Sequence, residues 1–153
     1  MIQVEGSIEI SARRQDVWEF INNPKRFPEW VDSVTEMVDV PKGGLSNGNL
    51  FQEYGNPGPF KGYTLWKVVE SKSPSVQIHK GVQGVMLFII ERHLKQKHHS
   101  TLLNQTTRMK FHTIMKPIEW ILANKMRTNS QQQLDQTLTN AKTIIETESL
   151  SPR

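Results

Sequence analysis

The chain has 153 residues and a formal net charge of +4, and it contains no cysteine. The lack of cysteine excludes disulfides, thiol nucleophiles and every metal or cluster site built on thiolates. The N-terminus has no basic stretch followed by an apolar run, and no apolar segment reaches the ~18 residues of a membrane span, so we expect a cytoplasmic protein without such a span. We predict one domain over residues 1–153, with residues 147–153 as a disordered tail.

The first elements are a strand and two short helices. Apolar and polar residues alternate over residues 2–10, which predicts a strand with one wet face. Ser11 is placed to cap a helix over residues 14–21, in which Val17, Phe20 and Ile21 share one side. Prolines break this helix and leave a second, short helical turn at Phe27-Pro28-Glu29-Trp30.

The centre of the chain predicts strands joined by short turns. Clusters of Gly, Pro, Asn and Ser separate runs rich in β-branched and aromatic residues, which is typical of an antiparallel meander. With the first strand, this gives seven strands in all. The central six are expected at residues 34–40, 48–54, 60–70, 76–80, 85–95 and 100–111.

A long amphipathic helix is predicted at residues 117–146. Pro117 suits a first helical position, and no further Pro or Gly follows until Pro152. The apolar stripe lapses at residues 128–130, where the helix either faces a cavity or is exposed or bent. Large aromatics usually serve as core, so we expect Trp18 and Trp120 to be buried. The stripe consists of Ile118, Leu122, Met126, Leu134, Leu138, Ala141 and Ile145.

In this order and spacing, the elements resemble the START/SRPBCC superfamily, and most closely its polyketide cyclase/dehydrase-like branch. The resemblance is carried by residues 8–12, residues 16–21 and the turn Phe27-Pro28-Glu29-Trp30. It implies an α+β helix-grip fold, in which a seven-stranded curved antiparallel sheet wraps round the long C-terminal helix. Two short helices follow the first strand. It also implies a ligand tunnel between helix and sheet, although this fold serves carriers, receptors, enzymes and interaction modules alike.

Alternation along the strands predicts which residues line that tunnel, if the face with fewer charges points inward. Strand 48–54 offers two similar faces, Phe51 with Glu53 and Leu50 with Tyr54, which the sequence does not separate. A buried Arg92 would need a carboxylate such as Glu53 or an anionic ligand group. The predicted cavity residues are Trp30, Phe51, Thr64, Trp66, Ile78, Phe88, Ile90, Arg92, Leu103, Gln105, Thr107, Leu122, Met126 and Ser130.

Catalytic and metal-binding candidates are few. Glu53 and Arg92 are weak candidates for acid–base chemistry, and no paired carboxylates or His–carboxylate set is identifiable. The five histidines lack metal-ligand spacing, and no phosphate loop or nucleophile elbow occurs, so we expect no metal and no cofactor. The densest basic segment, residues 92–99, is interpreted as a strand end and solvated hairpin tip, so no nucleic-acid partner is expected.

Three hypotheses for function follow. The first is binding of a small hydrophobic ligand, such as a lipid or a polyketide- or isoprenoid-like molecule, in an internal cavity and without chemistry. The second is an enzyme of the polyketide cyclase/aromatase type. The third is an interaction module that meets a ribosome, a membrane or a protein partner through its basic surface. The sequence does not determine the ligand or the oligomeric state.

Overall fold

The computed structural model describes residues 1–150, and residues 151–153 lie outside the described part of the chain. One antiparallel sheet holds seven strands in the order β1-β7-β6-β5-β4-β3-β2, so every strand after β1 pairs with its neighbour in sequence and β7 returns to β1. The predicted strands and their order are confirmed. The strands are β1 (Ile2–Ile10), β2 (Val34–Asp39), β3 (Leu50–Gly55), β4 (Gly62–Lys72), β5 (Val76–Gln83), β6 (Met86–Gln96) and β7 (Thr101–Phe111).

The helices also follow the predicted order. Helix α1 (Arg14–Ile21) and the 3-10 turn η1 (Pro24–Arg26) lead to α2 (Phe27–Trp30), and η2 (Thr113–Met115) leads to the long α3 (Lys116–Leu150). The α+β helix-grip arrangement is therefore confirmed. Of the expected tail, residues 147–150 continue α3, and residues 151–153 lie outside the described residues.

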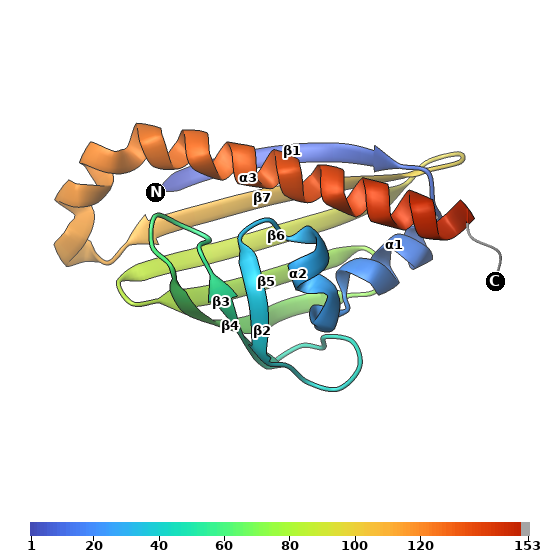
Figure 1. The fold of residues 1–153 in the computed structure, drawn as a ribbon, viewed down its shortest axis with the longest axis horizontal. Coiled ribbons are helices and arrows are strands. Elements are labelled where there is room, and N and C mark those ends of the chain that lie inside the picture. The colour runs from blue at the N-terminus through green and yellow to red at the C-terminus, as the bar shows by residue number, and fades with distance from the viewer. Residues whose placement is uncertain (151–153) are drawn as a thin grey trace.

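The long helix covers one side of the concave face of the sheet. α3 packs mainly on β1 and β7, and α2 lies between α3 and β2 over the other side (Figure 1). Gly6 of β1 permits close packing, since a Cβ there would stand 3.0 Å from Leu138 and 3.5 Å from Leu134. The apolar stripe from Met126 to Ile145 is buried as predicted.

The first turns of α3 depart from that pattern. They stand across the end of the sheet before the helix turns along β1 (Figure 1). Trp18 is buried as predicted, but the prediction that Trp120 is buried was wrong, because its side chain is 83% exposed. This part of α3 lies beyond the end of the sheet, so it has no opposing face on which to pack its outer side.

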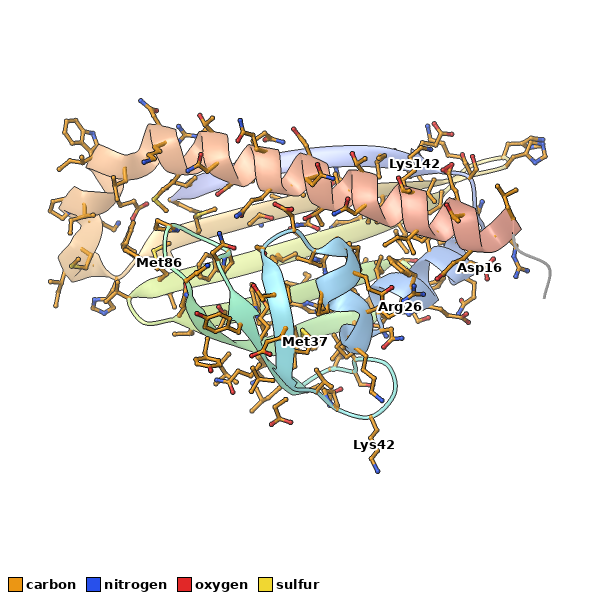
Figure 2. The ribbon with its side chains drawn as sticks, viewed as in Figure 1. Asp16, Arg26, Met37, Lys42, Met86 and Lys142 are labelled. Carbon is orange, nitrogen blue, oxygen red and sulfur yellow. The ribbon has the colours of Figure 1, made fainter. Side chains whose placement is uncertain are left out.

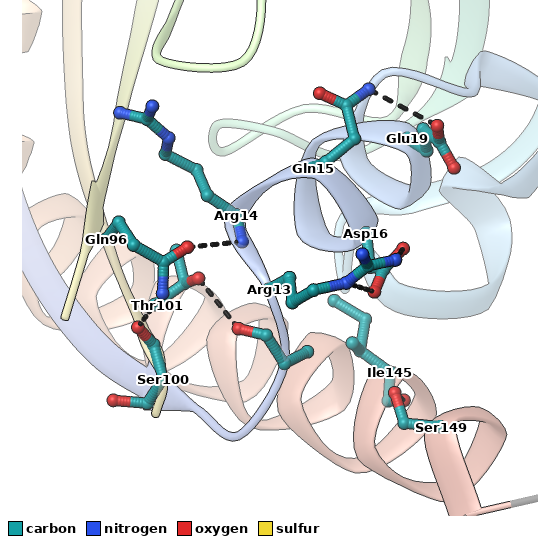
Figure 3. Close-up of polar contacts among 11 residues, drawn as sticks. Arg13, Arg14, Gln15, Asp16, Glu19, Gln96, Ser100, Thr101, Ile145 and Ser149 are labelled. Atoms are coloured by element: carbon teal, nitrogen blue, oxygen red, sulfur yellow. Dashed lines mark hydrogen bonds and ion pairs between the residues drawn. The ribbon is translucent and has the colours of Figure 1, made fainter. Parts of the chain in front are cut away.

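The junction between β1 and α1 is held by side chains from the β6–β7 hairpin. The Arg14 amide donates to Gln96 Oε1 at 2.8 Å, and Thr101 Oγ1 donates to the Ala12 carbonyl at 2.8 Å (Figure 3). The prediction that Ser11 caps α1 was wrong. The N-cap residue is Arg13, which makes no side-chain cap bond, and Gln96 satisfies the first turn instead.

Within residues 1–150, no helix has both the length and the apolar character needed to cross a bilayer.

Candidate functional site

The inward faces of β3 to β6 enclose a small hollow of about 30 Å³, roughly the room for one water molecule. Three ionisable side chains line it: Glu53 from β3, His79 from β5 and Arg92 from β6. All three are at least 95% buried. Ionisable groups held together in an apolar interior are the type of feature that marks functional sites, so we take this hollow as the inner part of the candidate site.

Aromatic side chains nearly fill the space around the hollow. Phe51 stacks on Trp66 with ring centres 6.2 Å apart, and Phe88 and Phe27 lie within 6.1 Å of this pair. Trp66 lies flat against β5 because its partner there is Gly81, where a Cβ would stand only 2.7 Å from the indole ring. The ligand tunnel that the family resemblance implied is therefore almost closed by side chains.

Arg92 is held by neutral partners. Its Nε donates to Gln105 Oε1 at 2.7 Å, its Nη1 donates to Gln77 Oε1 at 3.3 Å, and the guanidinium lies 4.9 Å from the centre of the Trp30 ring. Burial lowers its pKa to about 10, and the charge of Glu53 opposes that shift. Arg92 therefore keeps its charge at neutral pH without a direct ion pair, and this charge is available to a carboxylate or another anionic group.

Glu53 is the group in this cluster that titrates near neutrality. Burial raises its pKa from 4.5 to about 7, against the effects of the Trp66 indole N–H and the Arg92 charge. That indole N–H lies toward the carboxyl group without reaching ordinary hydrogen-bond geometry. A carboxyl group with such a pKa can donate or accept a proton near pH 7.

His79 completes the cluster and stays neutral. Burial, followed by the nearby Arg92 charge, lowers its pKa to about 3. Its Nε2 has no hydrogen-bond partner within residues 1–150, and the same holds for Trp30 Nε1 and Thr64 Oγ1. Unpaired buried polar atoms are costly, so they mark places where a ligand or water would gain hydrogen bonds.

A second, larger hollow lies on the outside, between α3 and the loop of residues 56–60 that joins β3 to β4. We call it the outer groove. Its volume is about 640 Å³, within the range of small-molecule sites. Leu122 and Met126 give it an apolar floor, and Asn129, Gln133 and Gln136 are among the amide side chains that line it. The polar lapse predicted at residues 128–130 thus faces this groove through Asn129 and Ser130.

The loop of residues 56–60 separates the two hollows. Pro57 lines the inner hollow, while Asn56 and Gly58 line the outer groove. A Cβ at Gly58 would stand 3.2 Å from the Phe88 ring, so the loop lies directly on the aromatic core. Gln133 Nε2 of α3 donates to the Asn56 carbonyl at 3.1 Å. The wall between the two hollows is therefore one short loop, joined to α3 by that side-chain bond.

The chain's arrangement agrees with solved structures of low sequence identity. A polyketide-cyclase-like protein from Corynebacterium glutamicum has a TM-score of 0.65 at 18% identity, with 97% of this chain and 93% of that chain covered. A START superfamily protein from Mycobacterium smegmatis has a TM-score of 0.71 at 12% identity, with 94% and 98% covered. The chain has the helix-grip fold of the START/SRPBCC superfamily.

A longer protein also shares this START/SRPBCC fold. The di-domain ARO/CYC of the steffimycin biosynthetic pathway has a TM-score of 0.76 at 12% identity. The match covers 97% of this chain and 51% of that one, so the chain corresponds to about half of it. The sequence matches no protein-family model and no curated protein. At these identities the likeness shows the fold and leaves the site to be argued from its own residues.

The predicted cavity residues of this START/SRPBCC fold divide into three groups. Leu122, Met126 and Ser130 line the outer groove. A second group lines the inner hollow: Phe51, Trp66, Ile90 and Arg92, with Glu53. The remaining inward residues belong to the packed interior around these hollows: Trp30, Thr64, Phe88, Leu103, Gln105 and the half-buried Thr107.

The prediction that Ile78 lines the cavity was wrong. Ile78 alternates with buried Gln77 and His79 on β5, so its side chain points to the outer face of the sheet. We chose it for its apolar character, but β5 turns its polar residues inward. Because we took the apolar face of β5 as the inward one, we also missed His79 and Gln77 as inward residues. The alternation on the neighbouring strands, continued across to β5, would have placed both of them inward.

Within residues 1–150, no three His, Asp or Glu side chains lie close enough together to hold a metal ion.

Proposed function

We propose that the chain binds a small hydrophobic molecule, of lipid, polyketide or isoprenoid type, between the sheet and α3, without chemistry of its own. The observation that supports this most is the position of the outer groove, directly across one short loop from a buried cluster of Arg92, Glu53 and aromatic rings. Apolar walls with a few oriented polar groups are typical of ligand sites. The groove's amides and Arg92 would orient the ligand, and burial would provide most of the affinity.

Entry of the ligand would need the loop of residues 56–60 to move outward. The loop is held by few bonds: Gln133 to the Asn56 carbonyl, the Asn56 amide to the Ser33 carbonyl at 2.9 Å, and Gln83 to the Phe60 carbonyl at 3.1 Å. Loops joined to the rest of a protein by few hydrogen bonds open locally at a lower free-energy cost than global unfolding. The small inner hollow would then be the closed form of the site, which a ligand enlarges by selecting the open form.

A fluorescent fatty acid, cis-parinaric acid, provides a direct test. The variant Asn129→Phe would fill the outer groove from an exposed position on α3. Thr139→Phe is the matched control, since Thr139 is exposed on the same helix outside the groove. We expect the wild type and the control to bind the probe alike and Asn129→Phe to bind roughly tenfold more weakly. Equal binding by all three proteins, or none by the wild type, would contradict the proposal.

A cyclase-type enzyme is the second candidate, and Glu53 is the observation that favours it. Its carboxyl group points inward and has a pKa raised to about 7, as acid–base catalysis requires. On this reading Glu53 would exchange protons with a poly-β-ketone chain while Arg92 stabilised an enolate. A linear poly-β-ketone should then cyclise faster with the wild type than with Glu53→Gln, and equal rates would remove this candidate.

The single domain over residues 1–153, the cytoplasmic location and the absence of a cofactor stay predictions.

A further inference from the structure

Large apolar side chains gather in solvent at the end of the molecule where α3 begins. Ile114 is 80% exposed, Trp120 83% and Ile121 72%, and Ile118 is partly exposed beside them. Val85 of the β5–β6 turn lies at the same end, because its carbonyl accepts the His112 amide at 2.7 Å. We call these five residues the apolar end. Figure 2 shows side chains projecting outward around this part of α3.

The helical spacing turns the apolar residues away from the protein. The exposed side of α3 is shared by Pro117, Trp120 and Ile121, since Trp120 and Ile121 follow Pro117 by three and four residues, which are the spacings of neighbours on a helix surface. Glu119 points the other way, where its carboxylate accepts the Phe111 amide at 3.2 Å and lies 2.7 Å from the N-terminal amine. The outer side of these turns is therefore apolar and free of acids.

Four cations surround the apolar end: Lys110, Lys116, Lys125 and Arg127. All four are exposed, and none pairs with an acid within the described part of the chain. Between residues 110 and 127 the one acid is Glu119, which the N-terminal amine already neutralises. The surface presented to solvent here combines a tryptophan, isoleucines and an excess of positive charge.

We propose that the apolar end docks on anionic phospholipid bilayers. Tryptophan prefers the boundary between headgroups and acyl chains, isoleucines gain from burial there, and lysines are attracted to anionic headgroups. A nucleic acid would use the cations and leave the isoleucines in water. A second copy of the chain would bring four cations against four cations. An anionic lipid surface is the partner that suits both features, and this inference does not depend on the proposed ligand.

The tryptophans provide the measurement. Trp18, Trp30 and Trp66 are at most 4% exposed, so Trp120 alone of the four meets water. Vesicles of phosphatidylcholine mixed with phosphatidylglycerol should therefore shift the protein's emission to the blue and sediment with it. Vesicles of phosphatidylcholine alone should do neither, and added salt should weaken the binding.

Two variants test which residues carry the binding. Trp120→Ser should lower vesicle partitioning roughly tenfold, and Lys116→Gln with Lys125→Gln should lower both the partitioning and its dependence on salt. Leu50→Ser is the control, because Leu50 is 58% exposed on β3, which β4 separates from β5 and the β5–β6 turn. Circular dichroism checks that each variant is folded, which is expected since all these side chains are exposed.

Three outcomes would overturn the proposal. The first is an emission spectrum that anionic vesicles leave unchanged. The second is equal vesicle binding by Trp120→Ser and Leu50→Ser. The third is light scattering that shows a dimer which Trp120→Ser dissociates, because the apolar end would then serve a second copy of the chain.

Discussion

The two hollows of the candidate site differ in almost every property. The inner one has about 30 Å³ of space and is lined by Glu53, His79, Arg92 and aromatic rings. The outer groove has about 640 Å³, and its lining combines the apolar Leu122 and Met126 with amide residues, Asp32 and Lys125. The buried ionisable groups are thus concentrated in the hollow that has little room, and the larger groove has only surface side chains such as Asp32 and Lys125 for polar chemistry.

The difference teaches that the loop of residues 56–60 is the decisive element of the site. If it stays closed, the inner cluster is a structural feature of the core, and ligands reach the groove alone. If it opens, the groove's volume and the cluster's chemistry become one site. Each prediction below alters one side of this comparison.

The largest effect is expected from Arg92→Met. This change leaves the side-chain carbonyls of Gln77 and Gln105 without their donor and removes the charge that opposes the raised pKa of Glu53. We expect the free energy of unfolding to fall by about 3 kcal/mol, as measured by urea denaturation.

Arg108→Met is the control for Arg92→Met. Arg108 lies on the outer face of β7, where it pairs with Glu91 at 3.2 Å in partial contact with solvent. Its loss should cost less than about 1 kcal/mol. If the two variants lose equal stability, the inner cluster has no special energetic role.

Glu53→Gln should change how stability depends on pH. Because the native pKa of about 7 lies above the ordinary 4.5, the native state binds the proton more tightly than the unfolded state. This contribution is complete below pH 4.5 and is lost as the pH rises through 7. The stability of Glu53→Gln relative to wild type should therefore increase over that range, by up to about 3 kcal/mol. Denaturation at several pH values measures it.

Stability must be compared between Glu53→Gln and wild type at each pH, because His79 also makes the stability of the wild type depend on pH. The lowered pKa of His79 has the opposite sign, so acid below the ordinary value of 6.5 favours the unfolded state, and the two groups partly cancel in the wild type. The difference between the two proteins isolates Glu53, because both contain His79. A difference that does not change with pH would mean that the Glu53 carboxyl group titrates normally.

The sequence predicted the fold far better than it predicted the space inside. Turn residues and alternation located all seven strands, and on β4 and β6 the outward charges revealed which residues face inward. β5 misled us because it turns Gln77, His79 and Gln83 inward and leaves Ile78 outside. Gln77 is inward because Arg92 and the Asn22 side chain offer it hydrogen bonds. Gln83 donates to the Phe60 carbonyl, whereas His79 Nε2 has no partner within the described residues.

The size of a cavity depends on how side chains pack, which no pattern records. We placed Phe51, Trp66 and Phe88 on the inward face, yet these side chains pack against one another and occupy the space that the family resemblance implied. The wrong prediction for Trp120 has the same cause. We expected it in the core because large aromatic side chains usually lie there, but the sequence does not reveal that the sheet ends before this part of the helix.

The smallest effect concerns the loop that separates the two hollows. Gln133→Ala removes the hydrogen bond from α3 to the Asn56 carbonyl. A bond of this kind contributes about 1 kcal/mol, so amides of residues 56–60 should exchange roughly fivefold faster in hydrogen–deuterium exchange, while global stability changes little. Gln132→Ala is the matched control, since Gln132 lines the same groove but makes no side-chain hydrogen bond within the described residues.

Faster exchange in Gln133→Ala alone, together with faster entry of cis-parinaric acid, would mean that the loop governs access to the inner cluster. Faster exchange with unchanged entry would mean that ligands remain in the outer groove, and the inner hollow would then be part of the core.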